Sequence, residues 1–118
     1  MLSILGRTNK KGLFMAQIIL LYNLKSGVSR EDFHDWVRTT DYPAMRGLAS
    51  VDSFRTMESK QLLMGEGAPS FKYVEIFDVN DIGTFTGTDM PGAVVQNIMG
   101  QFMGFADAPE FILAEEVK

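Results

Sequence analysis

The chain has 118 residues, of which 46% are hydrophobic and 22% are charged, and its formal net charge is −4. This length fits one domain with a buried core, and the composition is ordinary for a globular protein. An acidic surface repels phosphate backbones, so we expect no nucleic-acid partner. The sequence has no cysteine and one histidine, which excludes disulfides, thiolate chemistry and a multi-histidine metal site within one chain. We therefore expect no metal, and the lack of cysteine favours a cytoplasmic location.

The first residues of the chain differ from the rest. They place Arg7, Lys10 and Lys11 between two short apolar patches, which is the wrong order for a signal peptide. The following run, MAQIILLYNL, is too short to cross a bilayer and is interrupted by polar residues, so we expect no membrane partner. We predict a flexible N-terminal extension over residues 1–14 and a single domain over residues 15–118.

The first predicted element is a strand at residues 17–24, QIILLYNL, because a nearly continuous run of branched apolar residues is typical of a strand buried on both faces. A helix over residues 30–40 follows, with Ser29 as its N-cap. The apolar face of this helix, at spacings of three and four, consists of Phe33, Trp36, Val37 and Thr40. We expect Pro43 to end the helix, because the residue before a proline is pushed out of helical geometry.

Two strands are predicted at residues 50–59 and 71–79, where β-branched and aromatic residues alternate with polar ones, and we expect them to form a hairpin. A short helical piece starts at NDIGTF, and a second helix starts near Pro91, a favoured first position. The apolar stripe of this helix consists of Val94 or Val95, Ile98, Phe102 and Phe105. The segment FADAP is expected to end it before a closing strand at residues 110–117.

The resulting order is β-α-β-β-α-β, which is typical of the ferredoxin-like α+β fold, a four-stranded antiparallel sheet with two helices on one face. Such a sheet leaves its other face uncovered, and the predicted strands are apolar on both faces. Soluble monomers avoid large exposed apolar surfaces. We therefore predict a homodimer in which the two open sheet faces pack together, a dimeric α+β barrel.

The richest polar segment is HDWVRTTDYPAMRG, residues 34–47. His34 lies about 90° from the centre of the apolar helix face, taking ~100° per residue. It is a candidate general acid or base because the pKa of histidine lies near neutral pH, and the alternative is a surface histidine in a charged flank. Asp41 is a second candidate for moving protons, and the alternative is an aspartate that accepts local backbone hydrogen bonds at a turn.

Three further residues of this segment are candidates for binding a substrate. Trp36 offers a flat wall for an aromatic ligand and an N–H donor, although its position on the apolar stripe equally fits a core residue. Tyr42 and Arg46 could fix a carbonyl or a carboxylate, which the planar guanidinium of arginine holds well.

The two hairpin strands carry another group of candidates, Arg55, Tyr73 and Glu75. If the strands pair in a suitable register, Arg55 lies near Glu75 on one face. A charged residue on an otherwise apolar face needs a partner. Such a pair would serve either as an ion pair at the dimer interface or as a polar anchor in a pocket.

Three parts of the sequence carry a family resemblance: LYNLKSGVSREDFHDWVRTTDYPAMRGLASVDSF, YVEIFDVND and FADAPEFIL. They resemble the REDY-like family that includes HapK and is associated with prodigiosin-type pigment biosynthesis. The resemblance spans roughly residue 16 to the C-terminus, and its most specific pieces are WVRTTDYP, SVDSF and the FADAPEFI terminus. It implies a branch of the dimeric α+β barrel superfamily, which also holds polyketide cyclases, cofactor-free monooxygenases, lactone isomerases and haem-degrading enzymes. The fold alone therefore does not choose a reaction.

The resemblance implies a protein of secondary metabolism that acts on a pyrrole-like or polyketide-like intermediate. The first hypothesis is an enzyme without a cofactor that cyclises, dehydrates or isomerises such a molecule, with His34 and Asp41 as catalytic residues. The second is a non-catalytic binder of a hydrophobic metabolite, and the third is a cofactor-free monooxygenase. All three imply a small hydrophobic or aromatic ligand.

Overall fold

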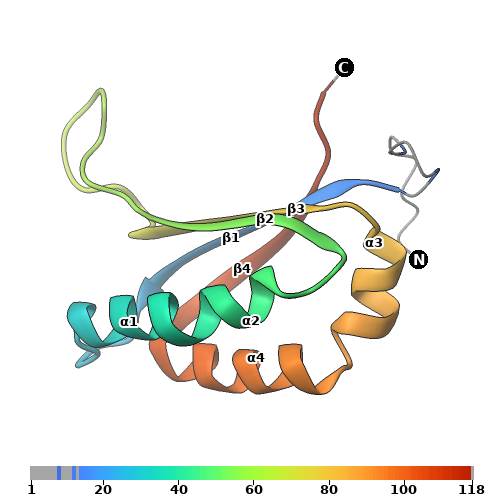
Figure 1. Ribbon diagram of the computed structural model, residues 1–118. Helices are drawn as coiled ribbons and strands as arrows, with labels where there is room; N and C mark the ends of the chain where they lie inside the picture. The colour runs from blue at the N-terminus through green and yellow to red at the C-terminus, as the bar shows by residue number, and fades with distance from the viewer. Residues whose placement is uncertain (1–7, 9–11, 13, 118) are drawn as a thin grey trace.

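The structure is a computed structural model that describes Thr8, Gly12 and residues 14–117 of the chain. Its four strands form one antiparallel sheet in the order β2-β3-β1-β4, and the described helices pack on one face of that sheet (Figure 1). This arrangement confirms the predicted α+β, ferredoxin-like fold. The predicted extension over residues 1–14 lies almost entirely outside the described residues, and the single domain over residues 15–118 stays a prediction.

The most apolar strand lies inside the sheet. β1 (Ala16–Leu24) pairs with β3 (Tyr73–Val79) on one side and with β4 (Ala106–Ala114) on the other, and β2 (Val51–Glu58) is the edge strand next to β3. All four predicted strands are present. β4 starts earlier than predicted, directly after the last helix, and Ala108 near its start has a positive φ of 43°.

The first helical segment is longer than predicted because it continues through Pro43. It consists of α1 (Arg30–Trp36), a wide π-helical turn η1 (Val37–Asp41) and α2 (Tyr42–Arg46). In the π-helical turn, the N–H of the first α2 residue donates to the carbonyl of the first η1 residue. Pro43 then lies in the first turn of α2, a position where proline is well tolerated. The prediction that Pro43 ends the helix is therefore wrong.

The second helical region contains α3 (Ile82–Thr84), a π-helical turn η2 (Phe85–Asp89) and α4 (Ala93–Phe105). The predicted apolar faces of both long helical segments are confirmed by the buried residues Phe33, Trp36 and Val37 and by the buried residues Val95, Ile98 and Phe102. In the described part of the chain, no helix has the length and apolar character needed to cross a membrane.

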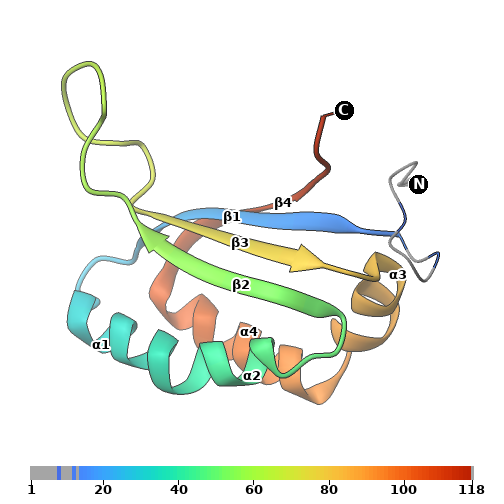
Figure 2. The same ribbon diagram turned by 45° about the horizontal axis from the view of Figure 1, so that its top comes forward.

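The other face of the sheet is not covered by any described element (Figure 2). Side chains alternate between the two faces of a strand. The pairing places Leu20 opposite Glu75 on the helix side and Ile19 opposite Ile76 on the uncovered side. Ile19 and Ile76 are partly exposed there. The uncovered apolar face is thus observed, and the homodimer that would cover it stays a prediction.

Candidate functional site

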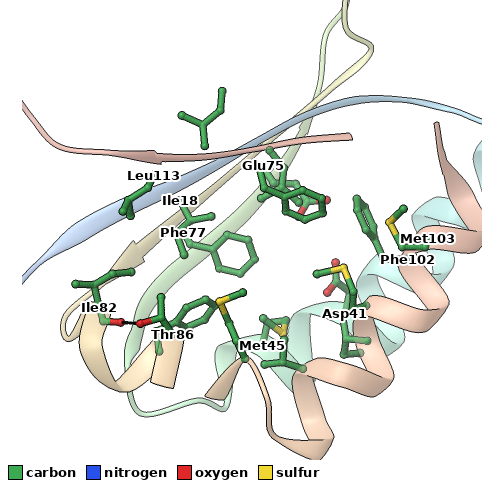
Figure 3. A pocket seen from close by; sticks show the side chains of 18 residues that line it. Ile18, Asp41, Met45, Glu75, Phe77, Ile82, Thr86, Phe102, Met103 and Leu113 are labelled. Atoms are coloured by element: carbon green, nitrogen blue, oxygen red, sulfur yellow. Dashed lines mark hydrogen bonds between the residues drawn. The ribbon is translucent and has the colours of Figure 1, made fainter. Parts of the chain in front are cut away.

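A cavity of about 510 Å³ lies between the sheet and the helices (Figure 3). This volume is in the range of small-molecule sites in proteins. Its walls are apolar side chains from β1, β3, β4 and the helices, and four of the lining residues are the methionines Met45, Met90, Met99 and Met103. Flexible thioethers adapt to the shape of an apolar ligand. Within the described chain, the polar side chains that line the cavity are Asp41, Glu75 and Thr86.

Part of the cavity wall is exposed to solvent. The lining residues Phe111 of β4 and Met103 of α4 are 49% and 40% exposed. Thr86 contributes little polarity to the interior, because its hydroxyl donates a hydrogen bond to the Ile82 carbonyl at 2.8 Å. The two carboxyl groups are therefore the main polar features that a molecule inside the cavity would meet.

Asp41 enters the cavity from the helix layer, at the end of the π-helical turn (Figure 3). Asp41 is only 3% exposed. No residue in the described chain donates a hydrogen bond to its carboxyl group. Burial raises the pKa of Asp41 to about 7, against the opposing effect of the positive charge of Arg46. The sequence-based expectation that Asp41 accepts local backbone hydrogen bonds is thus not met.

Glu75 enters the same cavity from the sheet and is 2% exposed. The Tyr22 hydroxyl on the neighbouring strand donates a short hydrogen bond to its Oε2. Burial raises the pKa of Glu75 to about 8, the negative charge of Asp41 adds to that rise, and the Tyr22 hydrogen bond opposes it. Burial and the Glu75 carboxylate likewise raise the pKa of Tyr22.

These two carboxyls form a buried acid–base pair. Burial brings the pKa values of both carboxyls close to neutral pH, so each carboxyl can gain or lose a proton in this range. An apolar cavity that offers a proton donor and a proton acceptor together is suited to general acid–base chemistry.

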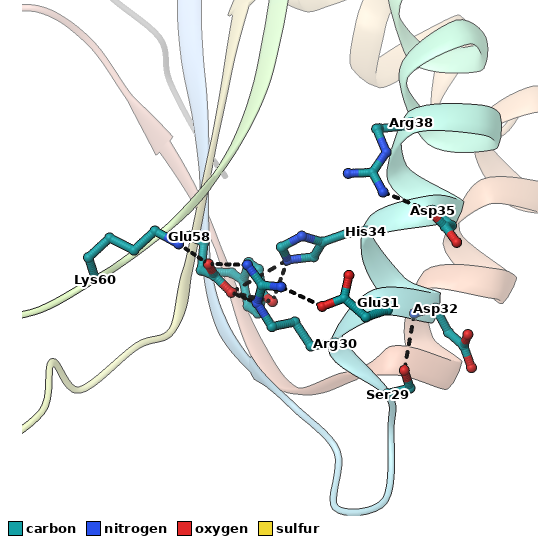
Figure 4. Close-up of polar contacts among 10 residues, drawn as sticks. Ser29, Arg30, Glu31, Asp32, His34, Asp35, Arg38, Glu58 and Lys60 are labelled. Atoms are coloured by element: carbon teal, nitrogen blue, oxygen red, sulfur yellow. Dashed lines mark hydrogen bonds and ion pairs between the residues drawn. The ribbon is translucent and has the colours of Figure 1, made fainter.

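A second pocket of about 220 Å³ lies between α1 and the outer end of β2, and His34, Thr56, Glu58 and Tyr73 are among its lining residues. His34 Nε2 lies 2.8 Å from the Tyr73 hydroxyl and 3.5 Å from Glu58 Oε2. Arg30 donates to both oxygens of Glu58, at 2.6 and 2.9 Å (Figure 4).

Glu58 is the centre of this outer pocket, and the sequence interpretation missed it. Arg30 and Lys60 donate hydrogen bonds to its carboxylate and hold the pKa of Glu58 far below its usual range. The alternation Phe54-Thr56-Glu58 along the strand was a signal for its placement, because these three residues share the helix side. A glutamate in line with Phe54 must reach the space beside the first helix.

Two stacked tyrosines contact residues of both pockets. Tyr22 and Tyr73 lie opposite each other in the β1–β3 pairing, with ring centroids 5.5 Å apart and planes 14° from parallel. The Tyr73 hydroxyl contacts His34 in the outer pocket, whereas the Tyr22 hydroxyl contacts Glu75 in the cavity. The predicted residues His34 and Tyr73 are therefore brought together, but outside the cavity that holds Asp41 and Glu75.

Trp36 packs in the core and lines neither pocket. Its indole N–H donates to the Gln101 amide oxygen at 2.7 Å, and its ring lies 5.2 Å from that of Phe105. Of the two interpretations of Trp36, the structure supports the core residue.

Tyr42 and Arg46 attach α2 to β2. The Tyr42 hydroxyl accepts the N–H of Thr56 at 2.9 Å, and Arg46 donates to the Phe54 carbonyl from Nε at 3.1 Å and from Nη2 at 2.8 Å. The Arg46 guanidinium also lies 3.6 Å from the centre of the Tyr42 ring. Tyr42 borders the outer pocket, while Nε and Nη2 of Arg46 are engaged with the Phe54 carbonyl of β2.

The suggested pairing of Arg55 with Glu75 is wrong. The strand register places Arg55 opposite Ile76 and Thr56 opposite Glu75. Neighbouring residues of a strand point to opposite faces, so Arg55 lies on the uncovered face and Glu75 lies in the cavity. Register could not be determined from the sequence, and a shift of one residue reverses the face.

Fold and cavity together define a ferredoxin-like α+β protein with a candidate site for a small molecule. The chain belongs to the family described as REDY-like protein HapK, whose model matches residues 16–117. This match confirms the resemblance found in the sequence. A comparison with curated proteins gives no match.

Solved structures with this fold include HapK from Hahella chejuensis, with 22% sequence identity, a TM-score of 0.68 and coverage of 86% of this chain and 92% of that chain. A hydroxynitrile lyase from Passiflora edulis has 10% identity, a TM-score of 0.73 and coverage of 88% and 94%. A dimeric ferredoxin-like protein of unknown function from Thermobifida fusca has 9% identity, a TM-score of 0.68 and coverage of 86% and 91%. At these identities the similarities show the fold alone.

Proposed function

We propose that the protein is an enzyme without a cofactor that moves protons on a small apolar molecule, in a cyclisation, dehydration or isomerisation. The observation that supports this function most is the pair of carboxyls, Asp41 and Glu75, in an otherwise apolar cavity. Membership of the HapK family favours a pyrrole-like or polyketide-like intermediate as the substrate. That one protein with this fold is named a hydroxynitrile lyase is consistent with small-molecule catalysis.

In this mechanism the ionised carboxyl removes a proton from carbon or nitrogen, and the protonated carboxyl delivers one to the atom where negative charge develops. The apolar walls keep water away from the reacting atoms, which strengthens these interactions. Positioned acid–base groups typically contribute about 10²- to 10⁴-fold to a rate. His34 lies outside the cavity, so its predicted catalytic role would apply only to a molecule in the outer pocket.

A suitable test uses β-tetralone, an apolar bicyclic ketone with exchangeable C–H protons beside its carbonyl. We expect the protein to accelerate deuterium exchange at these positions in D₂O, followed by NMR, and we expect Asp41→Asn and Glu75→Gln to lower this acceleration by roughly 10²-fold. Asp35→Asn removes an exposed carboxyl of α1 and is the matched control. An exchange rate that is the same with and without the protein would count against the proposed function.

The apolar walls also support a second function, that of a non-catalytic binder of a hydrophobic metabolite. The two functions differ in a direct observable. A binder retains its ligand unchanged, and native mass spectrometry of the purified protein would find a bound small molecule whose mass stays constant over time.

We also propose that two copies pack through their uncovered sheet faces. Ile19, Leu21, Val74 and Ile76 form a partly exposed apolar surface on that face, and the Thermobifida fusca protein with this fold is described as dimeric. Light scattering should give twice the chain mass of 13.2 kDa, and Ile76→Lys should restore the mass of one chain. A single-chain mass for the unmodified protein would rule out this assembly.

A further inference from the structure

We propose that the cavity takes an apolar ring molecule that carries a cationic nitrogen, either a protonated amine or an iminium, which pairs with Asp41 and Glu75. This substrate class rests on the proposed function, because it assigns a ligand to the same two carboxyls. Unlike the proposed function, the ligand class specifies that the ligand carries a positive charge.

The carboxyl pair has unused hydrogen-bonding capacity. Asp41 is only 3% exposed, yet its carboxyl accepts no hydrogen bond from the described chain. Tyr22 donates to only one oxygen of Glu75. Buried carboxyls normally have partners, and those without one carry a large desolvation cost. The side chains of this protein thus leave several acceptor positions that face the cavity, and a ligand with N–H donors would fill them.

The charged side chains that line the cavity, among the described residues, are both acidic. Among the lining residues of the cavity that the structure describes there is no lysine, arginine or histidine. Arg46 is the positive side chain that affects Asp41, but its guanidinium donates to the Phe54 carbonyl and stacks on Tyr42. The groups that act on the two carboxyls are therefore each other, the Tyr22 hydroxyl from β1 and the charge of Arg46 from α2. When both carboxyls ionise, a positive ligand would supply the missing counter-charge.

Other classes of ligand fit the two carboxyls less well. A carboxylate or phosphate ligand would place a third negative charge beside the pair with no cation to hold it, which is unfavourable at low dielectric. A purely apolar molecule would leave Asp41 without a partner. A ring compound with one cationic nitrogen adds no negative charge and gives Asp41 a partner. Its skeleton matches the apolar walls, and its N–H groups match the carboxyls.

The test compares three probes with the same ring system: 2-naphthylmethylamine, 2-naphthylmethanol and 2-naphthoate. Binding to the full chain is measured by calorimetry at pH 8. We expect the amine to bind at least tenfold more tightly than the alcohol, and the carboxylate to bind more weakly than the alcohol. At pH 6 the preference for the amine should fall several-fold, since the pKa values of Asp41 and Glu75 lie at about 7 and 8 and both groups then take up protons.

The variant comparison assigns the effect to the carboxyls. Asp41→Asn and Glu75→Gln should each reduce the ratio of amine to alcohol affinity, whereas Asp35→Asn on the surface of α1 should leave it unchanged. Because the three probes are compared on the unmodified protein, the test does not depend on the folding of a variant. Equal affinities, a preference for the carboxylate or no binding of any probe would overturn the proposed ligand class. Exchange of β-tetralone protons would still be observed in that case if the proposed function holds, so the two failures are distinguishable.

Discussion

The cavity and the outer pocket place carboxyl groups in opposite electrostatic conditions. In the outer pocket, Glu58 is surrounded by Arg30, Lys60 and the Tyr73 hydroxyl, and its negative charge is fully compensated. In the cavity, Asp41 and Glu75 face apolar walls and each other. The pocket with the most charged side chains is therefore not the one whose carboxyls have pKa values near neutral pH. Ion pairs lower the pKa of Glu58 and keep it ionised, whereas burial brings the pKa values of the cavity pair close to neutral pH.

The largest expected difference between the two regions is the pH dependence of stability. The folded-state pKa values of Asp41 and Glu75 are raised to about 7 and 8, so the folded protein holds protons that the unfolded chain releases. This contribution to the free energy of unfolding is complete at pH values below the ordinary carboxyl pKa and is lost as pH rises through 8. We expect urea denaturation to show a loss of a few kcal/mol between pH 5 and pH 9, on the order of 1.4 kcal/mol per pKa unit.

The matched variants sharpen this difference. Asp41→Asn should remove part of the loss, so that the variant is the more stable protein at pH 9. Glu58→Gln should leave the loss between pH 5 and pH 9 as it is, since the lowered pKa of Glu58 affects stability only as pH falls below its usual range. A stability curve that is flat over this range in the unmodified protein would remove the cavity pair from the comparison.

A smaller effect is expected at Glu58 itself. Glu58→Gln removes the charge to which Arg30, Lys60 and the Tyr73 hydroxyl bind. Since the Arg30 and Lys60 side chains are 50% and 72% exposed, we expect a loss of only about 1 kcal/mol at pH 7. Thermal denaturation at low and high salt measures it, and a variant as stable as the unmodified protein at low salt would show that these ion pairs contribute nothing.

The smallest expected effect concerns Thr56, whose buried hydroxyl has no hydrogen-bond partner among the described residues. Thr56→Val keeps the shape of the side chain and removes the unsatisfied group, so we expect stability to be unchanged or to rise by up to about 1 kcal/mol. Denaturant unfolding measures this change. A clear loss of stability would indicate that the hydroxyl has a partner in solution, such as a water molecule in the outer pocket.

Periodicity in the sequence was sufficient to predict the fold. The alternation in residues 71–79 and the spacing of Phe33, Trp36 and Val37 determine which faces are buried, and the structure confirms them. The helix end at Pro43 was predicted incorrectly, because a π-helical turn before the proline is a local rearrangement without a residue pattern of its own. That same turn carries Asp41 at its end.

The site was predictable only in part. Asp41 and Glu75 were both candidates, but they were assigned to different groups, since their meeting depends on how the helix layer lies over the sheet. The partner suggested for Glu75 was Arg55, but the register places Arg55 opposite Ile76, and the Tyr22 hydroxyl donates to Glu75 instead. Tyr22 lies in an apolar run of the sequence, where a tyrosine cannot be distinguished from other core residues.

The proposed function requires that Asp41 and Glu75 in the cavity gain and lose protons near neutral pH. The most direct measurement is a ¹³C NMR titration of the side-chain carboxyl carbons between pH 4 and pH 10, with Asp41→Asn and Glu75→Gln used for assignment. We expect two resonances of the pair to titrate with apparent pKa values of about 7 and 8, and each variant to remove one of them and to shift the other. Titration of both resonances near pH 4, as for exposed carboxyls, would contradict the claim.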